Sequence, residues 1–357
     1  MIYHLLAPLA SDVSALNVFR YITFRTGAAT LTALFISFLV GPSLIRALAR
    51  LRVGQPIREI GPAHQGKAGT PTMGGLLILL SLCVSVLLWS NLDNRFVWTV
   101  LGLTVGYGLL GFLDDYSKVR LRSSAGISAR AKLFWQTALA VVVAVAIYTD
   151  PDFDAVLAVP FFKNFKPHLG LFYIPMAAFI IVAASNAVNL TDGLDGLAIG
   201  PVMIAAGTFL ILSYAAGHVG IADYLAIKYV PGAGTLAIFC GALIGGGLGF
   251  LWFNAPPAQL FMGDVGSLAL GGALGTIAVL IRQEVLLAVV GGVFVIETLS
   301  VIVQVASFKL TGKRVFLMAP IHHHFEKLGW AEQKIVVRFW IISAILGLVA
   351  LSSLKLR

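Results

Sequence analysis

The chain has 357 residues, of which 59% are hydrophobic and only 11% carry a charge, and its mean hydropathy is +0.92. This composition lies outside the range of soluble globular domains and predicts an integral membrane protein. The formal net charge of +9 indicates contact with anionic lipid headgroups rather than with nucleic acid.

The N-terminal segment, residues 1–15, is apolar, but the first positive charge of the chain comes only at Arg20. The segment therefore lacks the basic region with which a cleaved signal peptide begins. We interpret it as a short interfacial segment.

Ten apolar runs follow, each near the length of about 20 residues that a helix needs to cross the hydrocarbon core. Runs this long and uniform differ from the short alternating segments of membrane β-strands. The sequence therefore predicts an all-α, polytopic membrane protein with about ten transmembrane helices, organised as a single domain over residues 1–357. The runs cover residues 27–44, 73–89, 97–113, 133–148, 171–188, 197–215, 235–252, 266–281, 285–308 and 338–354.

Positive charges are concentrated in the loops after the first, third and ninth runs, which hold sixteen of the 25 lysines and arginines. With ten spans these three loops lie on one side of the membrane, and the positive-inside rule makes that side cytoplasmic. Both termini are then expected on the outer, periplasmic side.

Two further loops on the cytoplasmic side contain carboxylates and no lysine or arginine. NLTDGLDGLA carries Asp192 and Asp195, and FNAPPAQLFMGDVGS carries Asn254 and Asp264. Asp192 and Asp195 are three residues apart, so in a helical turn they would share a face, where two like charges need a cation or donors between them.

A third acidic feature, Asp114 and Asp115 in FLDDYSKVR, is expected to begin the loop after the third span. Helix capping explains any one of these five carboxylates about equally well. Their convergence at the cytoplasmic ends of three helices favours a binding site.

The segment MAPIHHHFE after the ninth span contains His322, His323 and His324. Neighbouring side chains on a helix point about 100° apart, so three adjacent histidines are a poor ligand set for one metal ion. Imidazoles that donate to phosphate oxygens fit better. Three lysines would reinforce such a phosphate site: Lys67, Lys118 and Lys132.

Carboxylates for a hard divalent ion, basic groups for phosphate and a membrane setting together indicate phosphoryl transfer that involves a lipid. Mg²⁺ prefers oxygen ligands and usually binds through one or two carboxylates plus substrate phosphates. The sequence has neither a Walker A motif nor a dinucleotide glycine fingerprint, so a nucleotide would be held in another way.

The segments FLDDYSK, NAVNLTDGLDGLA, FNAPPAQLFMGDVGS and MAPIHHHFE together resemble the polyprenyl-phosphate sugar-1-phosphate transferases. The histidine segment is similar to that of the phospho-N-acetylmuramoyl-pentapeptide transferase branch, and the resemblance covers essentially the whole chain. It implies transfer of phospho-N-acetylmuramoyl-pentapeptide from its uridine diphosphate carrier to undecaprenyl phosphate, giving lipid I and UMP with Mg²⁺ required, as the first membrane step of peptidoglycan synthesis. It also implies the bacterial plasma membrane, an active site facing the cytoplasm, and suggests a homodimer.

The resemblance also assigns roles to individual residues. Asp264 matches the principal Mg²⁺ ligand, Asp114 matches the residue that acts on the lipid phosphate, and Asp115 lies beside it. His322, His323 and His324 match histidines beside the sugar phosphates. Matches to positions that bind substrate are Lys67, Thr72, Lys118, Lys132, Asn189, Asp192, Asp195, Asn254, Phe261 and Gln304, with Phe261 as a stacking surface for uracil and Arg130 as a near alternative to Lys132.

The donor is a charged nucleotide and the acceptor is a lipid, so the reaction has to take place where cytoplasm meets membrane. An alkyl phosphate has a second pKa near 6, by analogy with phosphorylated side chains, and is mostly dianionic at neutral pH. Proton removal by Asp114 should therefore contribute less than charge neutralisation and in-line positioning. Direct attack of the lipid phosphate is favoured, and a two-step route through phosphorylated Asp114 stays open.

Two other functions were compared with this one. A transferase that uses UDP-N-acetylglucosamine would share the chemistry, and only the histidine segment argues against it. A secondary transporter would place its ionisable groups near the bilayer midplane, whereas here only Glu297 lies deep in a span. Glu297 precedes Gln304 by seven residues and shares its helical face, so it is interpreted either as a structural hydrogen-bonding group, the favoured reading, or as part of the site lining.

Overall fold

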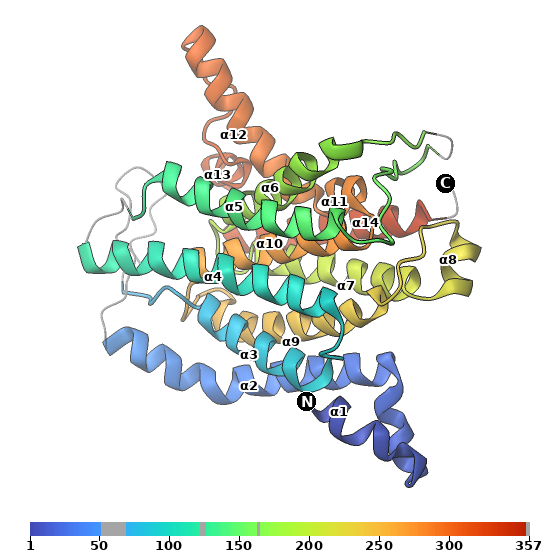
Figure 1. The fold of residues 1–357 in the computed structure, drawn as a ribbon. Coiled ribbons are helices and arrows are strands. Elements are labelled where there is room, and N and C mark those ends of the chain that lie inside the picture. The colour runs from blue at the N-terminus through green and yellow to red at the C-terminus, as the bar shows by residue number, and fades with distance from the viewer. Residues whose placement is uncertain (51–68, 122–125, 163–164, 355–357) are drawn as a thin grey trace.

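The computed structural model describes residues 1–50, 69–121, 126–162 and 165–354 (Figure 1). Among these residues the secondary structure is helical apart from an isolated antiparallel bridge between Val156 and His168. The all-α prediction is therefore confirmed.

The α-helices follow one another along the chain. They are α1 (Ile2–Leu6), α2 (Ile22–Arg50), α3 (Gly75–Trp89), α4 (Arg95–Leu121), α5 (Ala129–Tyr148), α6 (Tyr173–Thr191), α7 (Ile199–Ala216), α8 (Val219–Leu225), α9 (Leu236–Asn254), α10 (Gly263–Leu280), α11 (Glu284–Val290), α12 (Gly292–Thr311), α13 (Ile321–Lys327) and α14 (Glu332–Ser352). Short 3₁₀ turns lie between some of them.

In the described part of the chain, nine helices are long and apolar enough to cross a membrane: α2, α4, α5, α6, α7, α9, α10, α12 and α14. The remaining predicted run, residues 73–89, coincides with α3, which has only 15 residues. The chain is therefore a polytopic helical membrane protein.

One predicted run is not a single helix. Residues 285–308 divide into α11 and α12 at Gly291 and Gly292. Glycine is a poor helix former, and two in succession weaken the helix enough for tertiary packing to decide its direction. After this break α12 runs away from the bundle, so that its C-terminal part projects from the molecule (Figure 1).

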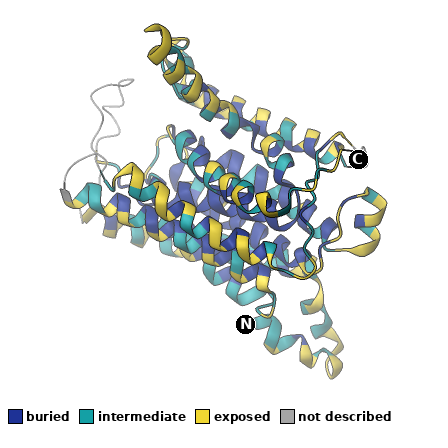
Figure 2. Cartoon of the chain, turned by 45° about the horizontal axis from the view of Figure 1, so that its top comes forward, coloured by how far each residue is buried: buried dark blue, intermediate teal, exposed yellow. Residues whose placement is uncertain are grey.

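The core lies along α9 and α10, and Figure 2 shows the buried residues concentrated in the middle of the bundle. In helix α10, 94% of the residues are buried. Helix α9 approaches α2 so closely that a Cβ atom at Gly245 would overlap the backbone of Thr30, and one at Gly249 would overlap Ser37. Glycine at these two positions therefore allows α2 and α9 to pack closely.

Two expectations about the acidic segments were wrong. Asp114 and Asp115 lie within α4, which continues to Leu121, because the basic residues of its last turn favour helix where a helix C-terminus carries partial negative charge. Asp192 and Asp195 do not share a helical face, since α6 ends at Thr191 and the chain turns before α7 begins at Ile199.

Candidate active site

Three carboxylates from two helices form an acidic cluster, defined as Asp114 and Asp115 of α4 and Asp264 in the first turn of α10. Each offers an oxygen within 4.8 Å of the others. Asp114 and Asp115 are both 1% exposed. The cluster is therefore a buried anionic site that needs compensating charge.

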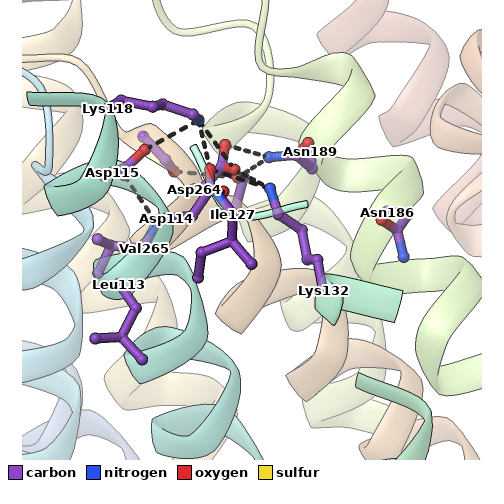
Figure 3. A network of polar contacts seen from close by, with 12 residues as sticks. Leu113, Asp114, Asp115, Lys118, Ile127, Lys132, Asn186, Asn189, Asp264 and Val265 are labelled. Carbon is purple, nitrogen blue, oxygen red and sulfur yellow. Dashed lines mark hydrogen bonds and ion pairs between the residues drawn. The ribbon is translucent and has the colours of Figure 1, made fainter. Parts of the chain in front are cut away.

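Two lysines provide that charge and approach the cluster from different sides (Figure 3). The Lys118 Nζ atom lies 2.6 Å from Asp114 Oδ2, 3.4 Å from Asp115 Oδ1 and 3.3 Å from Asp264 Oδ2. The Lys132 Nζ atom lies 2.6 Å from Asp264 Oδ2 and 3.1 Å from Asp114 Oδ2. Lys118 reaches Asp114 because residues four apart on a helix are neighbours.

Neutral donors fix the outer oxygens of the same carboxylates. The backbone N–H of Ile127 donates to Asp114 Oδ1 at 2.9 Å, and that of Val265 donates to Asp115 Oδ2 at 3.2 Å. The Asn189 amide donates to Asp264 Oδ1 at 2.9 Å and to Ser267 Oγ at 2.8 Å. These bonds hold the carboxylates in place and leave their inner oxygens to the lysines.

The cluster suits a divalent cation. Carboxylate oxygens are the ligands that Mg²⁺ prefers, and three of them meet here. Against three negative charges stand two ammonium groups, so the site has a formal charge of −1 before substrate binds.

Thr72 and Gly263 lie beside Asp115. A Cβ atom at Gly263 would come within 2.5 Å of Asp115 Oδ2 and 2.9 Å of Thr72 Oγ1. Thr72 is 2% exposed, and its hydroxyl has no hydrogen-bond partner among the described residues. The absence of a side chain at Gly263 lets the start of α10 approach the acidic cluster.

Asp192, at the end of α6, is half-buried near the acidic cluster. Burial first, and then the negative charges of Asp264, Asp115 and Asp195, raise the pKa of its carboxyl from 3.8 to about 8. Ionisation of Asp192 is therefore disfavoured in the free protein.

Asp195 and Asn254 join the two acidic loops to each other. Asp195 Oδ2 accepts a 3.1 Å bond from the backbone N–H of Ala258. The Asn254 side chain accepts from Gly196 N–H at 2.9 Å and donates to the Leu260 carbonyl at 2.9 Å. Asp195 is thus a buried carboxylate that accepts a backbone hydrogen bond, although its loop contains no lysine or arginine.

Phe261 and Gln304 occupy different surroundings. The Phe261 backbone accepts from Gly74 N–H and donates to the Pro71 carbonyl, while its ring is partly exposed. The Gln304 amide donates to the Phe316 carbonyl and accepts from the N–H groups of Val315 and Phe316. Gln304 therefore holds the segment that follows α12.

The three histidines make three different contacts. His322 Nδ1 lies 3.1 Å from Glu297 Oε2, and His323 Nδ1 lies 2.5 Å from Glu326 Oε2. His324 Nδ1 accepts from Leu317 N–H at 3.1 Å. Only His322 is buried, and it lies against Gly193 of the loop that carries Asp192.

Of the two candidate basic residues, Lys132 contacts the acidic cluster, whereas Arg130 is exposed. The predicted residue Lys67 lies outside the described residues.

A polar network behind the lysines was not anticipated. The Gln136 amide donates to Ser185 Oγ at 3.4 Å and accepts from Asn186 at 3.0 Å, and Ser185 donates to the Leu268 carbonyl at 2.9 Å. Gln136 lies one helical turn after Lys132 and ties α5 to α6 and α10. The sequence signal was a glutamine and an asparagine inside apolar runs.

The sequence of the chain matches known families and proteins. Residues 97–282 match glycosyl transferase family 4, and residues 67–79 match signature 1 of phospho-N-acetylmuramoyl-pentapeptide-transferase. Proteins named phospho-N-acetylmuramoyl-pentapeptide-transferase from Pelobacter propionicus and Geobacter sp. (strain M21) are 58% and 59% identical to the chain over 358 residues. One from Desulfosudis oleivorans is 57% identical over 359 residues, and all three alignments cover 100% of both proteins.

Proposed function

Since the chain belongs to the phospho-N-acetylmuramoyl-pentapeptide-transferase family, within glycosyl transferase family 4, we propose that it makes lipid I. It transfers phospho-N-acetylmuramoyl-pentapeptide from its uridine diphosphate carrier to undecaprenyl phosphate and releases UMP. It does so in the bacterial plasma membrane, with the site open to the cytoplasm.

The observation that carries this proposal is the acidic cluster with its two lysines. Phosphoryl transfer requires groups that hold two phosphates together despite their charges. Lys118 and Lys132 contact Asp114 and Asp264. Lys118 lies near the end of α4 and Lys132 near the start of α5, and both helices are long and apolar enough to cross a membrane. A lipid phosphate and a nucleotide can meet only at the boundary of the membrane.

Asp264, with Asp115 and Asp114 beside it, would hold Mg²⁺. The ion, when bound, screens the charge that keeps the two phosphates apart. Lys118 and Lys132 exchange their carboxylate contacts for phosphate oxygens as substrates enter, and Asn189 keeps Asp264 oriented. Phe261, half-exposed between the loops, offers its ring to the uracil.

Chemistry follows from that positioning. An oxygen of the lipid phosphate attacks the phosphorus that carries the sugar, forming a new P–O bond, and the diphosphate bond to UMP breaks with its electron pair leaving on UMP. Because the lipid phosphate is already mostly dianionic, Asp114 acts mainly through Lys118 and Lys132 rather than as a base. Both oxygens of Asp114 are engaged, which favours direct attack over a covalent intermediate.

The test is UMP release by the detergent-purified protein with undecaprenyl phosphate and Mg²⁺. The donors are UDP-N-acetylmuramoyl-pentapeptide and UDP-N-acetylglucosamine, and Asp264→Asn is the inactive comparison. We expect release with the muramoyl donor alone, reduced at least 10²-fold in Asp264→Asn. Release with the glucosamine donor instead would assign the protein to another branch of sugar-phosphate transfer.

A further inference from the structure

Glu297 and His322 form a buried pair that is separate from the acidic cluster. Glu297 lies in the second turn of α12 and is 0% exposed, and His322 lies at the start of α13 and is 1% exposed. Their contact, Nδ1 to Oε2, is 3.1 Å. A buried carboxylate is costly without a partner, so the two groups have to be considered together.

The free ring nitrogen of His322 points at the loop between α6 and α7. A Cβ atom at Gly193 would overlap His322 Nε2, so the loop backbone lies directly against this nitrogen. Nε2 is buried and has no hydrogen-bond partner among the described residues. Gly193 itself is exposed and follows Asp192, so His322 Nε2 lies beneath the loop that carries Asp192.

Gln304, on the same helix face, contacts only the backbone through the bonds that the structure gives it. It lies seven residues after Glu297 and uses its amide oxygen and nitrogen on the backbone of Val315 and Phe316. Glu297 instead contacts a side chain, and that side chain keeps one polar atom free. Holding the chain in place would not require an ionisable ring at position 322.

We propose that Glu297 is a positioning residue, which holds His322 through Nδ1 so that Nε2–H donates to the sugar-side phosphate of the nucleotide-linked donor. The carboxylate beside Nδ1 neutralises a proton on the ring, so both nitrogens can carry hydrogen in a buried place. A charged N–H donor is the stronger partner for a phosphate oxygen. This inference rests on the proposed function for the identity of the donor.

Binding of UDP and UMP separates this role from a structural one, because UMP lacks the second phosphate. The experiment measures both affinities by calorimetry, with Mg²⁺, for wild type, Glu297→Gln, His322→Asn and the double variant. Glu297→Gln keeps the shape of the side chain and removes its charge. Glu284→Gln is the matched control, since Glu284 is a buried carboxylate that accepts from Tyr173 beyond the end of α10 opposite Asp264, and α10 is about 27 Å long at 1.5 Å per residue.

We expect Glu297→Gln to weaken UDP binding about tenfold or more while UMP binding changes less than twofold. The double variant should bind UDP no more weakly than His322→Asn, because the two residues act through one contact. Glu284→Gln should leave both affinities unchanged. In ¹⁵N spectra of histidine-labelled protein with UDP, one ring should carry protons on both nitrogens in wild type and lose that state in Glu297→Gln.

Equal weakening of UDP and UMP, or losses that add in the double variant, would reduce Glu297 to a packing role. These measurements do not depend on the sugar. Failure of the wild type to release UMP from the muramoyl donor would overturn the proposed function alone. An unchanged UDP affinity in Glu297→Gln would overturn only the proposed role of Glu297 in positioning His322.

Discussion

Lys118 and Lys132 determine whether the three carboxylates of the acidic cluster can stay ionised so close together. Each ammonium group contacts Asp264 and Asp114, and Lys118 also contacts Asp115. The same ammonium groups are the natural partners of incoming phosphates. Removing a lysine that also binds phosphate should lower turnover more than removing one that only neutralises carboxylates.

Replacement of Lys132 tests this double role, with Arg130 as the control. Lys132→Ala should lower kcat/KM for UMP release by about 10²-fold or more, since a preorganised charge at the reacting phosphates is lost. Arg130→Ala, two residues away and exposed, should stay within twofold of wild type. Equal losses in both variants would remove Lys132 from the site.

Asp192 is expected to lower the stability of the free protein. Its pKa is raised to about 8 in the folded state, so above the unfolded value of 3.8 the folded carboxyl resists ionisation and the free energy of unfolding falls. This loss of stability grows between about pH 4 and about pH 8 and is absent below about pH 4. Asp192→Asn should therefore raise Tm in the absence of Mg²⁺ and donor, increasingly as pH rises from 4 to 8, while weakening donor binding.

Thermal unfolding in detergent across that pH range measures the effect. A Tm difference that does not depend on pH would show that Asp192 is not held in the environment described. The same variant with unchanged donor affinity would remove Asp192 from the binding site.

At the level of helices, the α2–α9 contact shows how glycines position the bundle. Gly245 lies against the backbone of Thr30, where no side chain fits, whereas Gly27 on α2 has nothing within 4 Å of an added Cβ. Both glycines lie in helices, so alanine improves helix propensity at either site. The packing around them makes the outcomes opposite.

Gly245→Ala should lower Tm, corresponding to about 1–3 kcal/mol of overpacking, whereas Gly27→Ala should leave Tm unchanged or raise it slightly. Fluorescence-detected unfolding in detergent compares the two. Similar Tm values for both variants would contradict the close contact between α2 and α9.

Over the whole molecule, the site occupies one end of the bundle and α8 the other. The C-terminal end of α4 and the start of α5 lie together, and α8 lies opposite them (Figure 1). The distribution of positive charge in the sequence predicts that the site end is cytoplasmic. The orientation and the suggested homodimer both stay predictions.

Impermeant thiol labelling tests the orientation in a background with Cys83 and Cys240 replaced by serine. Asp223→Cys in α8 and Lys313→Cys after α12 are both exposed positions. In spheroplasts, Asp223→Cys should react at once, and Lys313→Cys only after the membrane is opened. The reverse pattern would place the site outside, where the nucleotide donor does not occur.

Apolar runs and charged loops were enough to predict the helical membrane class, the positions of the spans and the residues of the acidic cluster, because burial in lipid imposes long uniform segments and makes isolated carboxylates conspicuous. The break at Gly291 and the Glu297–His322 pair could not be predicted, and the sequence left Arg130 open as an alternative to Lys132. Each joins or orients segments far apart in the chain, and such contacts depend on how helices pack rather than on local composition.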